Sequence, residues 1–230
     1  MLDIFIEGEL VDLAVPNLEF AGGDIWYAWF NDPSITRFLE QGAYPNTPEQ
    51  QKQFFNSIQD ERLALIIQNK KEKPVGVVSL SSLNYKKNSC DFAIVIDTTA
   101  DIRLAGVGAL EASALIIEHG FDMLGLDRIT AGQHVDLISW QQRLELIGFK
   151  LEGYHESKFV KGSEVADSVT IAVNRDDFQT IKSVRGGRLW DSSETMKKRI
   201  KNLPKLSMRE RMDTLFKKER KDYYNEIFNL

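Results

Sequence analysis

The chain has 230 residues, of which 43% are hydrophobic and 27% are charged, as in a soluble globular protein large enough to bury a core. Cys90 is the single cysteine, which excludes an intramolecular disulfide framework and a cysteine-rich zinc site. The sequence has neither an apolar run of the ~18 residues that a transmembrane helix needs nor a signal peptide at residues 1–10, so we expect a cytoplasmic protein.

The formal net charge of −5 is distributed unevenly along the chain. Residues 1–179 hold 27 acidic and 15 basic residues, a net charge of −12, whereas residues 180–230 hold 7 and 14, a net charge of +7. A basic tail can contact nucleic acid or a membrane surface, or it can pack on its own acidic body or on a partner subunit. We expect two parts, a body of residues 1–179 and an extension of residues 180–230.

The first half of the body begins with a short strand expected within residues 9–16. Two helical pieces follow over residues 24–39, separated at Pro33, because proline disfavours helix in the residue before it. Thr47-Pro48-Glu49-Gln50 has the capping residues of a helix start. Three strands with connections of hairpin length are expected next, at residues 63–68, 74–83 and 90–97. Strands joined in this way are expected to pair antiparallel.

The second half of the body is dominated by a helix expected over residues 109–124, where apolar residues recur every three to four positions. A strand at 129–135, a short helix at 139–147 and two strands at 149–160 and 165–173 follow. This order of elements is typical of a mixed α/β unit of three layers, with a mostly antiparallel central sheet and crossover helices.

The segment that leads into the long helix reads Arg103-Leu-Ala-Gly106-Val-Gly108. Two glycines let the backbone approach a ligand closely, and a helix N-terminus presents unpaired N–H groups, which together form a phosphate cradle. Glu111 replaces the third glycine of the dinucleotide fingerprint, and no Gly-Lys-Ser/Thr follows as in a P-loop. A turn without a ligand is the alternative interpretation.

Arg-x-x-Gly-x-Gly at the start of a long helix resembles the acyl-CoA pyrophosphate loop of the GNAT superfamily of N-acetyltransferases. Residues 144–153, with Gly148-Phe149, are similar to the end of that family's last helix and the strand after it. Residues 29–33 are similar to the first helices of the branch that contains ribosomal-protein N-terminal and amino-sugar acetyltransferases. The resemblance covers about residues 8–178 and implies a GNAT-like fold with acetyl-CoA as co-substrate.

The resemblance also implies where the co-substrate binds. It assigns the CoA pyrophosphate to backbone N–H groups of one segment, namely Arg103, Leu104, Ala105, Gly106, Val107, Gly108 and Ala109. Main-chain groups of Val95 and Ile96 would pair with the pantetheine arm like an added strand. Acetyl transfer in this family is a direct attack by a neutral amine on the thioester, which needs a base for the amine and a site for the oxyanion.

Two carboxylates are candidates for the base. Asp91 occupies the strand position where this branch often carries a carboxylate, and Glu40 lies in the region that usually borders the acceptor pocket. Either could instead be an ordinary surface carboxylate. The tyrosine that acts as general acid in some members would align with Leu144, so Ser139 or a water is left to protonate the thiolate. The asparagine that contacts the pantetheine in many members would align with Leu137. These departures leave open a CoA-binding protein with altered chemistry.

Other catalytic chemistries have little support. His119, His134 and His155 have no metal-ligand spacing, so no metal site is expected. A Gly-x-Ser-x-Gly elbow is missing and Cys90 has no assigned partner, so a covalent hydrolase is unsupported. We expect an N-acetyltransferase that acts on a primary amine of a small molecule, such as an amino sugar. The alternatives are a protein N-terminal acetyltransferase and a non-catalytic CoA-binding interaction module.

The extension has a helical pattern of its own. A capping box at Ser207-Met-Arg-Glu210 precedes an apolar stripe over residues 208–228 with basic residues between. Such a stripe favours docking on protein, either on the body or on a second copy in a homodimer. Contact with RNA or another polyanion, and with a membrane surface, are the alternatives.

Overall fold

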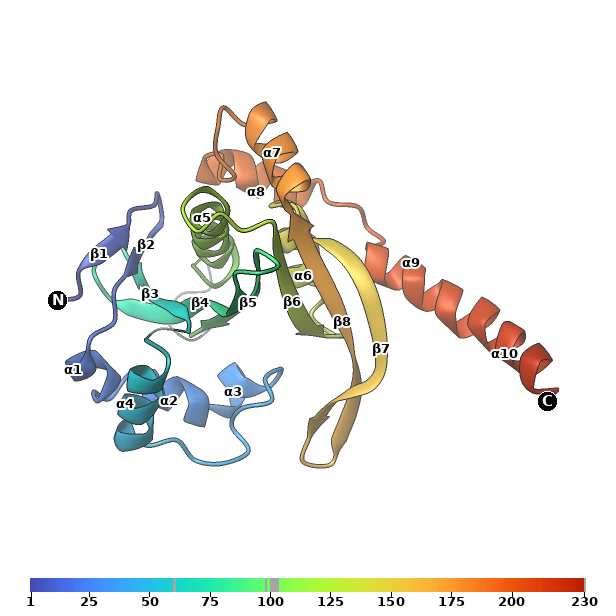
Figure 1. Cartoon of the computed structure of the whole chain (residues 1–230), viewed down its shortest axis with the longest axis horizontal. Helices are drawn as coiled ribbons and strands as arrows, with labels where there is room; N and C mark the ends of the chain where they lie inside the picture. Colours follow the sequence, from blue (N-terminus) through green and yellow to red (C-terminus); the bar gives the residue numbers. More distant parts are fainter. Residues whose placement is uncertain (60, 98, 100–103, 230) are drawn as a thin grey trace.

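A mixed sheet of eight strands organises the protein, whose computed structural model describes residues 1–59, 61–97, 99 and 104–229 (Figure 1). The strand order is β1-β2-β3-β4-β5-β6-β8-β7. The strands are β1 (Ile4–Ile6), β2 (Val11–Ala14), β3 (Leu63–Asn69), β4 (Pro74–Asn84), β5 (Ser89–Ile96), β6 (Arg128–His134), β7 (Lys150–Lys161) and β8 (Glu164–Asn174). All neighbours are antiparallel except β5 and β6. The predicted mixed α/β fold and the antiparallel β3-β4-β5 unit are confirmed.

The parallel strands β5 and β6 pair along only part of their length. Their ladder joins Ser89 to Arg128, Cys90 to Ile129 and Asp91 to Thr130, and it contains no later pair within the described residues. The C-terminal half of β5 remains bonded to β4, and that of β6 remains bonded to β8. The two strands therefore separate, and the sheet opens between their C-terminal halves.

Helices cover both faces of the sheet, as the predicted three layers require (Figure 1). One face carries α5 (Ala109–Asp122), α6 (Ile138–Glu145), α7 (Arg175–Val184) and α8 (Ser193–Lys201). The opposite face carries α1 (Leu18–Ala21), α2 (Trp26–Asn31), α3 (Pro33–Thr36) and α4 (Pro48–Ser57). Helix α5 is buried on nearly every side, because it lies between the sheet and the later helices.

The first part of the extension packs closely on the body. The Glu9 carboxylate accepts hydrogen bonds from the Trp190 indole (3.2 Å) and the Ser193 amide (2.7 Å), and Met196 is fully buried. Gln142 donates to the Pro204 carbonyl at 2.8 Å. Helix α7 runs across position 179, and the boundary between body and extension stays a prediction.

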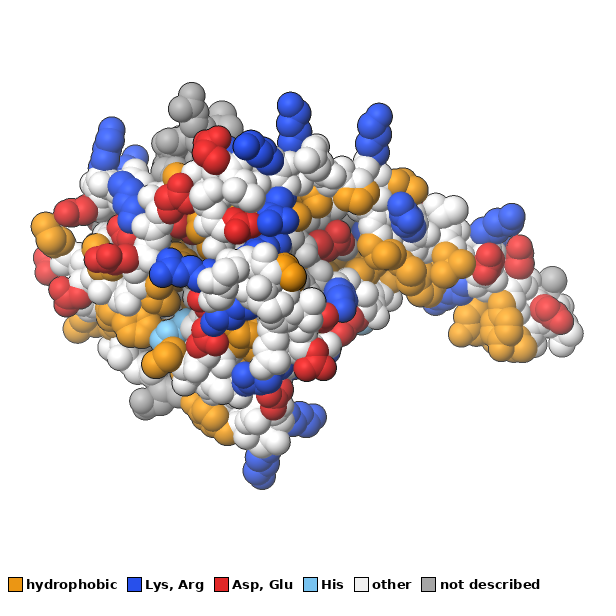
Figure 2. All heavy atoms as spheres, turned by 90° about the horizontal axis from the view of Figure 1, so that it is seen from above, with side chains coloured by type: hydrophobic (Ala, Val, Ile, Leu, Met, Phe, Trp, Pro, Cys, Tyr) orange, Lys and Arg blue, Asp and Glu red, His pale blue; other side chains and the backbone are white. Residues whose placement is uncertain are grey.

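The last part of the chain projects from the body as an arm, residues 208–228 (Figure 1). It comprises α9 (Met208–Leu215), a π-helical turn at Phe216–Arg220 and α10 (Lys221–Phe228). Figure 2 shows hydrophobic side chains gathered along the arm, where the exposed ones are Met208, Leu215, Tyr223, Tyr224, Ile227 and Phe228. Of the 14 basic residues of the extension, eight lie in residues 180–205 and six lie in the arm, between its apolar residues. None of the described helices combines the length and hydropathy of a membrane span.

Candidate active site

Small side chains form the floor of a cavity on the face of the sheet opposite α5. Ala64 pairs with Ser79, and Ser79 pairs with Ala93, across β3, β4 and β5. Because these side chains are short, they leave space beneath the sheet that the aromatic residues Trp26 and Phe54 wall in. The resulting first cavity has a volume of about 500 Å³, which is within the range of small-molecule sites.

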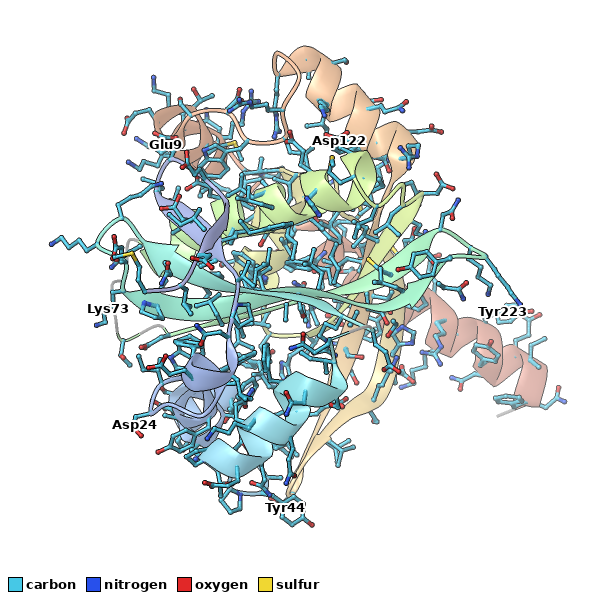
Figure 3. The ribbon with its side chains drawn as sticks, turned by 60° about the vertical axis from the view of Figure 1, so that its left-hand side comes forward. Glu9, Asp24, Tyr44, Lys73, Asp122 and Tyr223 are labelled. Atoms are coloured by element: carbon cyan, nitrogen blue, oxygen red, sulfur yellow. The ribbon has the colours of Figure 1, made fainter. Side chains whose placement is uncertain are left out.

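A second cavity, of about 300 Å³, lies beneath β6, β7 and β8. Residues 39–41 line both cavities, so the two lie side by side below the opening between β5 and β6. Lys161 of the β7–β8 hairpin donates a hydrogen bond to the Thr36 carbonyl at 2.5 Å, which holds the hairpin against α3. Figure 3 shows the side chains of the two layers, with Glu9 and Asp122 on the α5 side of the sheet and Asp24 and Tyr44 on the cavity side.

The two carboxylates suggested as bases lie on the cavity side. Asp91 belongs to the last residue pair before β5 and β6 separate, and its Oδ1 accepts a hydrogen bond from the Thr130 hydroxyl at 2.5 Å. It precedes Ala93 of the cavity floor by two residues, about 7 Å along the strand. Glu40 is exposed and lines both cavities. The structure therefore brings Glu40 to the cavities and Asp91 to their border.

The candidates for the general acid are less well placed. Ser139 is exposed at the start of α6 and is not among the lining residues of the two cavities. Leu144 is fully buried in the core on the α5 face. Burial raises the pKa of the Cys90 thiol to about 12, so this group remains protonated at neutral pH.

The glycine motif leads directly into α5, as predicted, and is itself helical. A π-helical turn at Leu104–Gly108 runs directly into Ala109, the first residue of α5. Since a helix leaves its first N–H groups without partners, the free donors are expected within this turn. Arg103 lies outside the described residues. Val95 and Ile96 lie on β5 beyond the last pair with β6.

Arg143 of α6 is a neighbour of this turn that sequence reasoning missed. A Cβ atom added to Gly106 would lie 3.2 Å from its guanidinium group. A cation at this distance from the turn adds to the attraction of a helix N-terminus for phosphate. No spacing in the sequence connects the two residues, because they belong to different helices.

The surroundings of His134 were also not predicted from the sequence. Its side chain is buried between Phe38 and Phe159, and its Nδ1 accepts a hydrogen bond from the Asp136 amide at 3.1 Å. Nε2 makes no hydrogen bond within the described part of the chain, and the Glu164 carboxylate lies 3.6 Å from it. The residue lines the second cavity. Among the described residues, no three His, Cys, Asp or Glu side chains gather as metal ligands would.

Comparisons with known proteins agree with this geometry. A family model described as "Acetyltransferase (GNAT) domain" matches residues 22–150, more than half of the chain. No curated protein sequence matches.

Solved structures supply the remaining comparison. The spermidine N-acetyltransferase from Vibrio cholerae, in complex with CoA and spermine, is similar over 74% of this chain and 98% of its own, with a TM-score of 0.62 and 17% identity. A GNAT-family acetyltransferase from Bacillus anthracis is similar over 75% and 99%, with a TM-score of 0.61 and 18% identity. Similarity at these identities shows the fold.

Proposed function

Because the chain belongs to the GNAT acetyltransferase family, we propose that it transfers the acetyl group of acetyl-CoA to a primary amine of a small molecule. The observation that carries this proposal is the opening between β5 and β6 directly above two adjacent cavities. Beyond Asp91, β5 has backbone groups on its β6 side that the β6 ladder does not use. Val95 and Ile96 belong to this stretch and can bond an extended pantetheine arm.

Acetyl transfer requires the protein to supply a base and a proton donor. The acetyl thioester supplies the electrophile: the amine nitrogen forms a bond to the carbonyl carbon, and the bond from that carbon to the CoA sulfur breaks. The amine must lose one proton, and the leaving thiolate must gain one. We propose the Asp91 carboxylate as the base, directly or through a water, with Glu40 as the second candidate. Ser139 or a water is the proposed proton donor.

The cofactor side of the proposal rests on the π-helical turn at Leu104–Gly108. Backbone N–H groups of Leu104, Ala105, Gly106, Val107, Gly108 and Ala109 are proposed to bind the pyrophosphate. Arg143 is proposed to add a positive charge beside Gly106. The Arg143 guanidinium can bind a phosphate oxygen through a charge-assisted hydrogen bond. The phosphate is then held more tightly than by the N–H groups of the turn alone.

An amino sugar remains our proposed acceptor. The first cavity has aromatic walls at Trp26, Phe30 and Phe54, against which the apolar face of a sugar ring can pack. Amide groups of Asn46 and Gln50 also line it and can bond sugar hydroxyls.

The test is an acceptor screen that follows release of the free CoA thiol from acetyl-CoA with amino sugars, amino acids, polyamines and N-terminal peptides. Acetylation of amino sugars supports the proposal, whereas acetylation of peptides alone would assign the acceptor to a protein N-terminus. A thermal shift with acetyl-CoA is measured alongside. No shift at 100 times a typical Kd, together with no thiol release, would overturn the cofactor assignment, because ligand at that excess raises stability by about 2.7 kcal/mol.

A further inference from the structure

Two buried hydrogen-bond donors on residues that line the first cavity have no partners. The Trp26 indole Nε1 and the Gln51 amide Nε2 have no acceptor in the described part of the chain, and both side chains are at least 98% buried. Both residues line the cavity. Buried polar groups in native proteins are nearly always bonded, so each orphaned donor needs an explanation.

The Gln51 amide is bonded at one of its two ends. Its Oε1 accepts a hydrogen bond from the Asn46 side-chain amide at 2.9 Å, so its NH₂ group is left as a donor. The Gln51 side chain can therefore donate a hydrogen bond at this point.

A cation completes this end of the cavity. Arg62 precedes β3, and its guanidinium lies 5.6 Å from the centre of the Phe54 ring. Phe54 is also the neighbour of Trp26, with ring centres 6.4 Å apart, and it follows Gln51 by one helical turn of α4. Arg62 is half-buried and makes no ion pair with the residues that the structure describes. Burial lowers its pKa, as expected for a cation without a counter-charge.

The opposite end of the cavity has the opposite charge. Glu40 lines both cavities and therefore lies toward the opening between β5 and β6, whereas Arg62 lies at β3. From β3 to β5 the sheet spans two strand spacings, about 10 Å. An amine near the opening thus has the Arg62 cation about 10 Å away at the other end of the same cavity.

We propose that the acceptor carries an oxyanion, a carboxylate or a phosphate, which Trp26, Gln51 and Arg62 bind while its amine lies toward Glu40. This inference rests on the proposed acetyltransferase function and narrows its substrate class. It also separates this chain from a polyamine acetyltransferase, because a polycation would set positive charge against Arg62. Phosphorylated or nucleotide-linked amino sugars and amino acids share the required chemistry.

The experiment compares matched acceptors that differ only in the anion. Glucosamine is paired with glucosamine 6-phosphate, and an amino acid with its amide, so that the two pairs distinguish phosphate from carboxylate. In the wild type, we expect kcat/KM for the anionic member of one pair to exceed that of its neutral partner by about tenfold or more, the usual effect of a charge-assisted hydrogen bond. Arg62→Gln should abolish this preference, because it lowers kcat/KM for the anionic acceptor.

Lys73→Gln is the matched control, since Lys73 is an exposed cation on the β3–β4 turn (Figure 3) and is not among the residues that line the cavity. It should keep the preference for the anionic acceptor. Gln51→Glu gives a second measurement, because a carboxylate placed among the donors should also remove the preference. Far-UV circular dichroism and the thermal shift with acetyl-CoA check that each variant folds.

Three results would decide against the inference. Equal kcat/KM within both wild-type pairs, a preference for spermidine over the anionic acceptors, or an unchanged preference in a folded Arg62→Gln variant would each overturn it. A protein that acetylates neutral amines in these experiments retains its proposed function. If no thiol is released with any amine, both proposals are wrong. The thermal shift with acetyl-CoA then shows whether the protein still binds the cofactor.

Discussion

The two faces of the sheet have opposite character. The α5 face holds the large apolar core, in which α5 is almost entirely buried and even Glu111 has its carboxylate satisfied by backbone N–H groups of residues 9–11. The cavity face has a smaller core around Trp26, two cavities, and buried donors without partners. Tight packing gives stability, whereas unfilled volume and unpaired polar groups are what a ligand can use.

This difference separates what each face contributes to the proposed reaction. On the α5 face the cofactor is expected to meet the backbone of a helix start, and side-chain changes there should alter cofactor affinity or folding. On the cavity face the acceptor is expected to meet side chains from several distant segments. Substitutions on one face should therefore leave the measured property of the other face unchanged.

The largest effect is expected from Asp91→Asn on the cavity face. Removal of a general base lowers the rate of proton transfer by about 10²–10⁴-fold, and we expect kcat to fall within this range. The affinity for acetyl-CoA, measured by titration calorimetry, should not change, because it depends on the other face. Glu40→Gln is the matched comparison and should chiefly raise the acceptor KM. A normal kcat for Asp91→Asn, with a lowered kcat for Glu40→Gln, would transfer the role of base to Glu40.

The next effect is expected from Gly106→Trp on the α5 side. An indole in the π-helical turn would fill the space between the backbone and Arg143, and acetyl-CoA affinity should fall about 100-fold. Gly106→Ala is the control at the same position. Its Cβ meets only the mobile end of the Arg143 side chain, at 3.2 Å, so affinity should change little. If Gly106→Trp binds acetyl-CoA normally, the phosphate cradle lies elsewhere.

Glu111→Ala tests the stability of the α5 face without touching either ligand site directly. It leaves the amides of Glu9, Leu10 and Val11 without their buried acceptor, which should cost about 3 kcal/mol of unfolding free energy. Urea denaturation measures the loss, and exposed Glu49→Ala provides a control that should be neutral. The preference among acceptors should be unchanged in folded Glu111→Ala protein. A large change in that preference would mean that the two faces are coupled.

The smallest effect on catalysis is expected from removing the arm. A chain that ends at Leu206 keeps α8 and its contacts with Glu9, so acetyl-CoA affinity and kcat should stay within about twofold. We expect the full chain to elute as a dimer through the arm and the shortened chain as a monomer. Elution of the full chain as a monomer would contradict docking between copies. Salt-dependent RNA binding by the full chain alone would favour a polyanion partner.

Local patterns in the sequence predicted the parts of the molecule that local forces determine. The α5 helix, the hairpins of β3, β4 and β5, and the glycine turn before α5 each have a periodicity or a turn residue within a few positions. Helix α7 and strand β1 were missed, because short elements depend on the packing of their surroundings.

The acceptor side shows why the rest could not be predicted. Arg62, Gln51 and Trp26 are far apart in sequence, and only the packing of α2 and α4 on β3 brings them to one cavity. Glu111 was read only as the residue that breaks a nucleotide fingerprint, whereas its carboxylate binds amides about 100 positions earlier in the chain. No spacing rule connects residues over such distances.

The bonds of Glu9 have a consequence for the order in which the chain can fold as it is synthesised. Glu9 receives hydrogen bonds from Ser193, 184 positions later, so this contact joins residues that are synthesised far apart in time. The backbone amides of residues 9–11 have their acceptor in Glu111, about 100 positions later in the chain. A growing chain therefore holds residues 9–11 without these partners until Glu111 and Ser193 have been synthesised. Final closure of the α5 face must therefore follow synthesis of α8.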